Sequence, residues 1–318
     1  LLGKKIEIVQ IDDQGDPAAG VKSAKAAIAD GLDGVVGPYN SGVGLKTLPL
    51  FIDDGLVPIR LTSDDATNGM GFTLQPMTYQ IAPVAAEAMS DWLKAKSVAI
   101  LFDGTEAYTK GQAKSVSEQL EKAGVKVVAS TGIKPGASDY SAEVKAAEKT
   151  GADVIYVVAY YPEAGAIAKE MAALNGSAKC LADYGAYDTG YIEAAGKQAA
   201  EDCPVVGVPA PSDFADSADH ISAYKDAQGK APGTWSPYTY DSVKLLADAV
   251  KKAGSFDSEK LTTALGGTKD WKGWTGSVTI DPKTGARDPA TVVVTRATGG
   301  EFSVDPEWAK AVGSPFGQ

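Results

Sequence analysis

The sequence predicts an α/β protein of two lobes, in which each lobe is a doubly wound, mostly parallel sheet with flanking helices. Short apolar runs alternate with longer stretches of helical period, which is the pattern of βαβ units. The alternation ends after Val208, which argues against a barrel of eight such units. The chain has 318 residues, and at roughly 150 residues per domain this length favours two domains.

Each predicted element follows from one of these two patterns. Apolar runs bounded by glycine, proline or polar residues predict strands at 5–11, 35–38, 57–61, 97–102, 125–130, 153–158, 179–183 and 204–208. Apolar residues spaced three or four positions apart predict helices at 18–29, 43–53, 84–94, 110–122, 140–149, 163–174 and near Tyr191. The C-terminal part predicts helices at 213–228, 237–253 and near Leu261, then a pair of strands at 273–280 and 291–295.

Three linker-like segments separate the two sets of βα units, at residues 74–77, 208–211 and 281–286. We therefore expect the first lobe to comprise residues 1–77 and 209–285. The second lobe is expected to comprise residues 78–208 and 286–318. Three connections between two lobes indicate a hinge beside a cleft, which is the usual position of a small ligand.

Composition excludes several classes of function. The 41 acidic and 30 basic residues give a net charge of −11, which argues against a nucleic acid partner because phosphates require Lys and Arg. The single histidine, His220, excludes zinc sites and catalytic triads that need several histidines, and its surroundings predict an exposed helix face. No apolar run approaches the ~18 residues that a bilayer span requires. We expect a globular protein without a metal or cofactor.

The two cysteines, Cys180 and Cys203, lie in two short apolar stretches that we interpret as strands. If these strands are neighbours, one disulfide can form, which would suit an oxidising compartment. Two buried thiols are the alternative.

Open α/β sheets bind ligands beyond the carboxyl ends of their strands. Ser41 precedes a predicted helix, and Thr62 and Ser63 follow a predicted strand, so their hydroxyls and nearby amides suit a carboxylate. Asp183, between Tyr160 and Tyr184 in the loops that follow later strands, suits an ammonium group. Each has a purely structural alternative: an N-cap for Ser41, a turn acid for Asp183 and packing aromatics for Tyr160 and, before a helix, Trp235.

Signals of catalysis are weak. The chain has no nucleophile elbow, no phosphate-binding P-loop and no complete Gly-x-Gly-x-x-Gly motif after its first strand. Adjacent acids such as Asp12 and Asp13 diverge on a strand or a helix. An α/β enzyme that uses Asp183 or Asp103 with a tyrosine remains the less favoured alternative.

Several segments together resemble a known family. They are Asp12-Asp-Gln-Gly-Asp-Pro17, Val35-Val-Gly-Pro-Tyr-Asn-Ser41, Asp139-Tyr-Ser141, Tyr160-Tyr-Pro-Glu-Ala-Gly165 and Tyr238-Thr-Tyr-Asp241. Over nearly its whole length the chain is similar to the type I periplasmic solute-binding proteins, specifically the branched-chain (Leu/Ile/Val-type) amino-acid binding proteins of ABC importers.

The resemblance assigns roles to nine residues. It implies that Ser41, Thr62 and Ser63 hold the ligand carboxylate and that Tyr108 and Tyr160 line the cleft. It implies an ammonium ligand at Asp183 or at the neighbouring Tyr184, which occupies the ungapped position. Two bulky residues, Tyr39 and Trp235, imply a restricted or polar-tolerant pocket for the ligand side chain.

The function that the resemblance implies is capture without catalysis. A small amino acid or analogue would bind in the cleft, the lobes would close on it, and an ABC-type membrane permease would receive it. We expect a monomer at the periplasm or the cell surface, with a lipid anchor on the precursor; a sensory ligand-binding domain of the same fold is the alternative. The resemblance also implies a strand and helix of roughly forty residues ahead of Leu1, on a separate polypeptide or outside this sequence, without which the first sheet would keep unpaired backbone groups.

Overall fold

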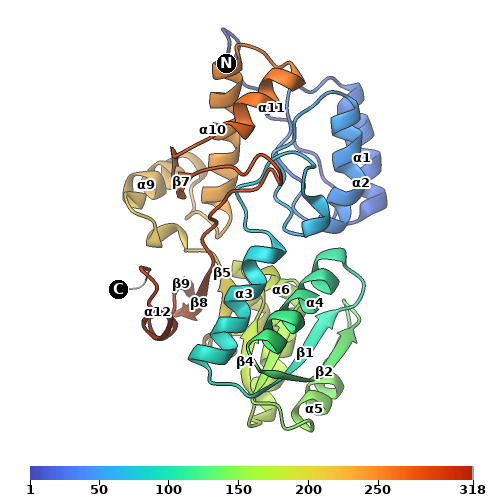
Figure 1. Cartoon of the computed structure of the whole chain (residues 1–318), viewed down its shortest axis with the longest axis vertical. Coiled ribbons are helices and arrows are strands. Elements are labelled where there is room, and N and C mark those ends of the chain that lie inside the picture. Colours follow the sequence, from blue (N-terminus) through green and yellow to red (C-terminus); the bar gives the residue numbers. More distant parts are fainter. Residues whose placement is uncertain (317–318) are drawn as a thin grey trace. The chain divides into compact units, whose positions relative to one another are not determined.

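The computed structural model describes residues 1–316 and divides the chain into two compact units (Figure 1). Unit 1 comprises Leu1–Met77 and Ser236–Ala290, and unit 2 comprises Thr78–Trp235 and the residues from Thr291 onward. The chain first passes between the units after Met77, where we expected it. The second passage follows Trp235 instead of Val208, and the third follows Ala290 instead of residue 285.

Residues 209–235 pack on unit 2, which explains the later second boundary. Asp213 ends a 3-10 turn, η4 (Pro211–Asp213), and accepts hydrogen bonds from the amides of Ala210 at 2.8 Å and Val304 at 3.1 Å. The second bond ties η4 to strand β9 (Glu301–Val304) of unit 2. Helix α9 (Ser217–Gln228) continues from this anchored turn.

Unit 2 is built on a seven-stranded sheet with the order β2-β1-β3-β4-β5-β8-β9. The first five strands in this order are parallel, and the last two are antiparallel to their neighbours. The parallel strands confirm those predicted in this region: β1 (Ser97–Asp103), β2 (Lys126–Ile133), β3 (Val154–Val158), β4 (Lys179–Ala182) and β5 (Val205–Gly207). All five residues of β3 are buried, as expected for a parallel strand covered on both faces.

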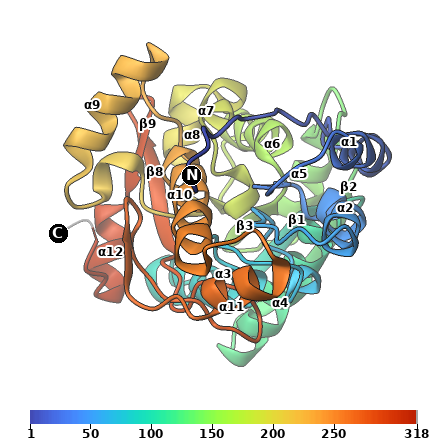
Figure 2. The same cartoon turned by 90° about the horizontal axis from the view of Figure 1, so that it is seen from above.

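Helices cover both faces of this sheet, which is the doubly wound arrangement. Figure 2 shows α3 (Thr78–Glu87) and α4 (Ala107–Lys122) together on one face. The opposite face carries α5 (Ser141–Glu148), α6 (Tyr161–Leu174), α7 (Thr189–Ala195) and α8 (Lys197–Asp202). The helix predicted at 84–94 instead begins at Thr78 and ends in a π-helical turn at Ala88–Trp92.

The C-terminal strands pair differently from our prediction. The segment predicted at 291–295 is β8 (Val293–Thr298), which lies between β5 and β9 in unit 2. The segment predicted at 273–280 contains β7 (Gly276–Val278), which pairs with β6 (Trp271–Gly273) in unit 1. The predicted pairing of these two segments is therefore wrong, because the apolar β8 completes a buried sheet while β6 and β7 form a local hairpin. Helix α12 (Pro306–Val312), which we did not predict, follows β9.

The strands predicted at 35–38 and 57–61 form isolated bridges among the described residues of unit 1. The bridges join Val36 to Ile59, Ile59 to Phe72 and Thr73 to Ala286. Helices α1 (Pro17–Ala29) and α2 (Ser41–Asp53) pack side by side next to them (Figure 2). Ile59 is fully buried and is the one residue that belongs to two of these bridges.

Residues 5–11, which we predicted as a strand, are outside any ladder. Their backbone groups make no hydrogen bond with the described part of the chain. Ile6, Ile8 and Val9 are 50%, 78% and 57% exposed, while Ile11 packs beside a small core of Ala24, Val35, Phe51 and Leu56. Alternating apolar residues favour a strand, but a strand also requires a partner for its backbone groups.

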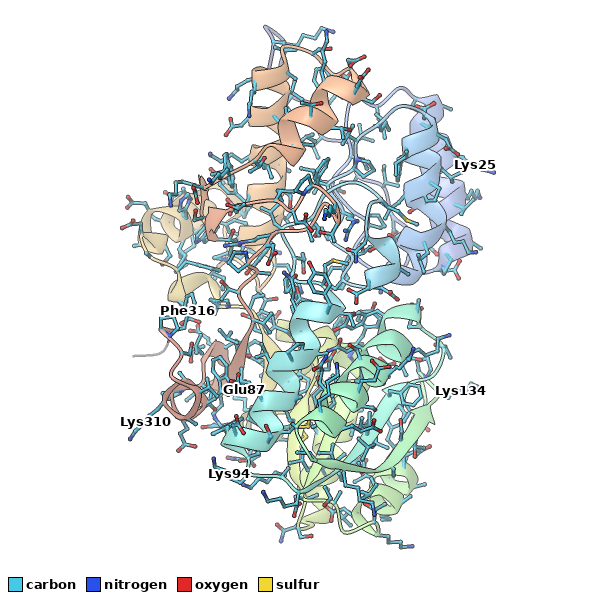
Figure 3. The ribbon with its side chains drawn as sticks, viewed as in Figure 1. Lys25, Glu87, Lys94, Lys134, Lys310 and Phe316 are labelled. Carbon is cyan, nitrogen blue, oxygen red and sulfur yellow. A yellow bond between two sulfur atoms is a disulfide. The ribbon has the colours of Figure 1, made fainter. Side chains whose placement is uncertain are left out.

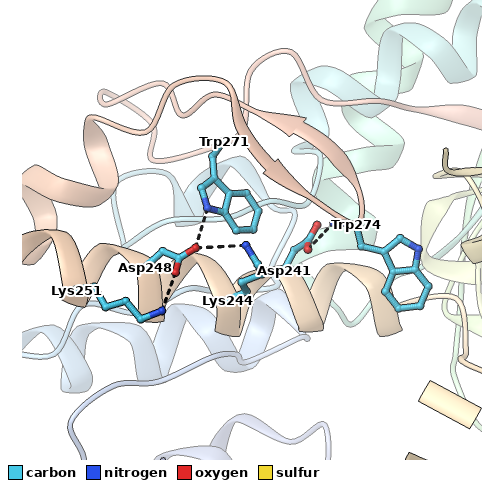
Figure 4. Close-up of polar contacts among 6 residues, drawn as sticks. All are labelled: Asp241, Lys244, Asp248, Lys251, Trp271 and Trp274. Atoms are coloured by element: carbon cyan, nitrogen blue, oxygen red, sulfur yellow. Dashed lines mark hydrogen bonds and ion pairs between the residues drawn. The ribbon is translucent and has the colours of Figure 1, made fainter. Parts of the chain in front are cut away.

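Helix α10 (Ser236–Ala253) anchors the β6–β7 hairpin of unit 1 through two acids (Figure 4). Asp241 is fully buried and accepts hydrogen bonds from the amides of Trp274 and Thr275, at 2.8 and 2.7 Å, and from the Thr275 hydroxyl. Asp248 accepts a bond of 3.2 Å from Trp271 Nε1 and pairs with two lysines of α10. Helix α11 (Ser258–Gly266) packs against α10.

Cys180 and Cys203 form a disulfide, with a sulfur–sulfur distance of 2.01 Å. Cys180 lies in β4, and Cys203 lies two residues before β5, the neighbour of β4 in the sheet. This confirms the first of the two alternatives that the sequence left open.

Lysine side chains project outward from the ribbons of both units. Lys25, Lys94, Lys134 and Lys310 all point away from the backbone in Figure 3. Among residues 1–316, no helix has the length and apolar composition needed to cross a membrane.

Candidate functional site

Unit 1 presents polar groups at the N-terminus of α2. Asn40 is the N-cap residue, and its side chain makes no capping hydrogen bond. The amides of the first helical turn therefore receive no acceptor from a capping side chain. Ser41 begins the helix at this point and is 2% exposed. Unpaired amides and the positive end of the helix dipole favour an anion here.

The Ser41 hydroxyl is held by the loop that follows the bridge at Ile59. Its oxygen accepts hydrogen bonds from the amides of Ser63 at 3.3 Å and Asp64 at 3.2 Å. Both bonds use the hydroxyl oxygen as acceptor, so its proton stays available as a donor. Within the described chain this proton is donated to no residue. A carboxylate oxygen is a suitable acceptor for it.

A close approach between α2 and the 62–64 segment makes these contacts feasible. A Cβ atom on Gly44 would lie 2.6 Å from the Cγ2 atom of Thr62, so only glycine allows this spacing. The Thr62 side chain itself is fully buried, and its hydroxyl is bonded to that of Thr67 at 2.8 Å. Arg60 also donates to the Thr62 carbonyl at 3.2 Å. The Thr62 hydroxyl thus has an internal partner, and its role in ligand binding stays a prediction.

Unit 2 brings aromatic residues together at the carboxyl ends of its parallel strands. Tyr108 follows β1 and Tyr160 follows β3, and their ring centroids are 6.3 Å apart. Tyr160 is half-buried and occupies the N-cap position of α6. A Cβ on Gly185 would lie 3.0 Å from the Ala159 carbonyl, which places the turn after β4 tightly against the same edge. The sequence correctly placed these loops beside one another.

A second aromatic cluster in unit 2 joins Tyr184 to Trp235. Their ring centroids are 5.2 Å apart, and Tyr187 meets Trp235 edge-on at 5.4 Å. Tyr184 and Tyr187 are almost fully buried, whereas Trp235 is half-buried. Trp235 is therefore the member of this cluster with an accessible ring. Tyr39, the other predicted pocket residue, is half-buried in unit 1 next to Asn40 and Ser41.

Asp183 lies where the sequence placed it, directly after β4, but its carboxylate is fully buried. It accepts hydrogen bonds from the Tyr108 hydroxyl at 2.7 Å, from Gln112 Nε2 at 2.8 Å and from the Tyr156 hydroxyl. All four residues belong to unit 2. These contacts supply the carboxylate with internal donors, and its role as the ammonium ligand stays a prediction.

Burial dominates the electrostatics of this cluster. It raises the pKa of Asp183, although hydrogen bonds from Tyr156, Tyr108 and Gln112 act in the opposite direction. Burial and the adjacent Asp183 also raise the pKa values of Tyr108 and Tyr156 well above the ordinary tyrosine value. The tyrosines therefore remain protonated donors at neutral pH.

The sequence did not predict several residues that contact the candidate site residues. They are the Asp64 amide and Thr67 in unit 1, and Gln112, Tyr156 and Tyr187 in unit 2. Tyr156 carried a usable signal, because a tyrosine within the otherwise apolar segment 154–158 must find a partner for its hydroxyl. Among the residues that the structure describes, no group of three or more His, Cys, Asp or Glu is arranged to hold a metal ion.

Unit 1 carries a set of polar groups suited to an anion, and unit 2 separately carries a set of aromatic rings suited to apolar contact; both are typical of proteins that bind small solutes. A family model described as "Periplasmic binding protein" matches residues 1–301. The chain belongs to this family, as the resemblance in its sequence implied.

Relatives and solved structures agree with this membership. Leu/Ile/Val-binding protein homolog 1 of Brucella abortus (strain 2308) is 29% identical over 299 residues, which covers 92% of this chain and 79% of that protein. Leu/Ile/Val-binding protein BraC3 of Rhizobium johnstonii is 31% identical over 288 residues, covering 88% and 77%. The crystal structure of a leucine binding protein, LivK, from Thermotoga maritima MSB8 shares the fold, with a TM-score of 0.89 and 24% identity over 96% of this chain and 88% of that chain.

Proposed function

We propose that this protein captures a small amino acid or amino-acid analogue outside the cytoplasm and delivers it to an ABC-type permease without chemical change. The family membership and the Leu/Ile/Val-binding names of the relatives support the solute class. A periplasmic or cell-surface location agrees with the family and with the disulfide. Anchoring by a lipid on a precursor remains part of this proposal.

The observation that carries the proposal is the Ser41 hydroxyl. It is buried, it is oriented by two backbone amides, and its proton has no acceptor among the described residues. A ligand carboxylate would receive this proton and would also face the unpaired amides that begin α2. In unit 2, the half-buried rings of Tyr160 and Trp235 are of the type that lines small-molecule pockets.

Capture would be coupled to a conformational change of the protein. A ligand favours whichever conformation binds it more tightly. The free energy available for this shift is limited to the difference in ligand affinity between the conformations. We propose that the permease distinguishes the liganded protein on this basis.

Ser41→Ala tests the carboxylate site. We expect it to weaken binding of the preferred amino acid by about 1–3 kcal/mol, because it removes a hydrogen bond to a charged group. Isothermal titration calorimetry against a panel of L-amino acids measures this loss.

Ser23→Ala is the matched control, because Ser23 lies in α1 of the same unit and its hydroxyl donates to the Asp12 carbonyl at 2.8 Å. It should leave ligand affinity unchanged. Equal affinity of Ser41→Ala and wild-type protein for every amino acid that the wild type binds would contradict the assignment of Ser41.

A further inference from the structure

The sequence contains three asparagines, and two of them precede a glycine, in Asn68-Gly69 and Asn175-Gly176. Glycine has no side chain to shield its own backbone nitrogen, so this nitrogen can reach the side-chain carbonyl carbon of the preceding asparagine. Asparagine is one of the thermolabile residues of proteins. The structure gives these two pairs different surroundings.

Asn175 follows the last residue of helix α6, in an exposed turn of unit 2. Its backbone has φ 49° and ψ 46°, a left-handed conformation that asparagine adopts more readily than most residues. Its amide donates to the Met171 carbonyl at 3.1 Å, whereas its side chain makes no hydrogen bond with the described residues. Asn175 and Gly176 are both exposed, so water reaches this turn.

The Gly176 amide is the group that would attack, and it donates to no acceptor among residues 1–316. The next two amides are held. Ser177 and Ala178 donate to the carboxylate oxygens of Glu148 in α5, both at 3.2 Å. The restraint on this turn therefore begins one residue after the nitrogen that would react.

The Asn68-Gly69 pair of unit 1 is restrained. The Gly69 amide donates to the Thr284 carbonyl at 2.9 Å, and the Asn68 amide donates to the Asp65 carbonyl at 3.1 Å. Asn68 is half-buried, and its Oδ1 atom is shielded from solvent. A nitrogen engaged in such a bond can attack only after the segment opens locally. Asn68 thus serves as a control within the same molecule.

We propose that Asn175 is a site of spontaneous deamidation. The Gly176 nitrogen loses its proton to water and attacks the Cγ atom of Asn175. A bond forms between these two atoms, the bond from Cγ to Nδ2 breaks, and ammonia leaves. Water then opens the resulting five-membered imide at one of its two carbonyl carbons. The products are aspartate and isoaspartate, and the only co-reactant is water.

Deamidation would add a negative charge at an unfavourable position. The new carboxylate would lie at the C-terminal end of α6, where the helix dipole is negative. The Glu148 carboxylate is close by, because a Cβ atom on Gly176 would overlap it. Repulsion between the two carboxylates would weaken the bonds that Glu148 accepts from Ser177 and Ala178. We therefore expect the modified protein to be less stable.

Mass spectrometry of tryptic peptides tests the proposal. Trypsin places the three asparagines in separate peptides, 26–46, 61–94 and 170–179. Wild-type protein is incubated at pH 8 and 37 °C for several weeks. Peptide 170–179 should acquire the mass gain that accompanies replacement of an amide NH2 by a hydroxyl group. This gain should appear about tenfold or more faster than in peptide 61–94, because the Gly69 amide is held.

Two controls separate the effect of the fold from that of the dipeptide. Peptides 61–94 and 170–179, released by digestion before the incubation, should convert at similar rates, because the Gly69 amide has then lost its partner. Asn175→Gly should abolish the gain in peptide 170–179, and glycine suits the left-handed turn. In urea unfolding at low salt, Asn175→Asp should lower the midpoint and Asn175→Gly should not.

Three results would overturn the proposal. Peptide 170–179 of the folded protein could keep its mass while the digested peptides convert, which would show that the turn protects Asn175. Peptide 61–94 of the folded protein could convert as fast as peptide 170–179, so that the bond to Thr284 would give no protection. An unchanged unfolding midpoint for Asn175→Asp would contradict the loss of stability.

Discussion

A buried carboxylate needs donors in place of water, and Asp183 receives them from three side chains. Two of the donors, Tyr108 and Gln112, are one turn apart on α4, and the third is in β3. The cluster thereby joins α4 and the Tyr108 ring to the sheet. Asp183 holds Tyr108 in this position through the bond from its hydroxyl.

The pH dependence of stability should reveal this buried acid. Because the folded pKa of Asp183 is raised, the native state holds its proton more tightly than the unfolded chain does. Its contribution to stability is fully present below the unfolded pKa of about 3.9 and is lost as pH rises through the folded pKa. The stability advantage of wild-type protein over Asp183→Asn should therefore shrink as pH rises from acid to neutral, as measured by urea unfolding.

Asp153→Asn is a control of opposite sign. Hydrogen bonds from the amides of Lys96 and Ser97 and from the Ser97 hydroxyl lower the pKa of Asp153, so its contribution is lost as pH falls through the folded pKa. The advantage of wild type over this variant should grow with rising pH. A gap for Asp183→Asn that also grew with pH would contradict the burial argument.

Prediction from sequence located several residues correctly in the fold, while their roles in ligand binding stay predictions. Ser41 and Ser63 follow directly from the rule that loops after strands bind ligands, and the structure joins them by a hydrogen bond. The rule also placed Asp183 at the correct edge. Its burial could not be predicted, because the donors are 27 to 75 residues distant in sequence and meet it only in the folded sheet.

At the level of elements, the periodicity of a segment predicted whether it forms a helix or a strand. It did not predict which strands pair with one another. Helices α4 to α7 and the five parallel strands of unit 2 agree with the prediction because each forms from its own βα unit. The partner of β8 could not be predicted, because it depends on which sheet edge is left open after β5 forms. Residues 5–11 show the same limit, since their alternating pattern is compatible with a strand but supplies no partner.

The disulfide joins β4 to the segment before β5. It should raise the free energy of unfolding by about 3 kcal/mol, because it closes a loop between cysteines 23 residues apart and so lowers the entropy of the unfolded chain. We expect a reducing agent to lower the midpoint of guanidinium unfolding of the wild-type protein accordingly. The double variant Cys180→Ala/Cys203→Ala should unfold at this lower midpoint, and a reducing agent should not shift it further. Equal midpoints for oxidised and reduced wild type would contradict a stabilising role.

On the scale of the whole molecule, each unit is assembled from two separate stretches of chain. Unit 2 takes β8, β9 and α12 from the residues beyond Thr291. Val293 and Val294 are at most 1% exposed, and Trp308 is 2% exposed, so this stretch is part of the core of unit 2.

A chain that ends at Ala290 should therefore fail to form unit 2 correctly. It would leave the edge of β5 without its antiparallel neighbour and would uncover the apolar surface that β8 and Trp308 bury. We expect low soluble yield and no cooperative unfolding transition, as followed by circular dichroism. A soluble product with a wild-type unfolding transition would show that the C-terminal stretch is dispensable.

The division of unit 1 between Leu1–Met77 and Ser236–Ala290 also sets an order in time. A chain made from its N-terminus produces the first part of unit 1, then the long central stretch of unit 2, and only afterwards α10 and the hairpin that complete unit 1. At typical synthesis rates this interval lasts on the order of ten seconds. During it, Thr73 lacks the backbone partners at Gly285 and Arg287 that complete unit 1, so the oldest part of the nascent chain stays open to non-native contacts.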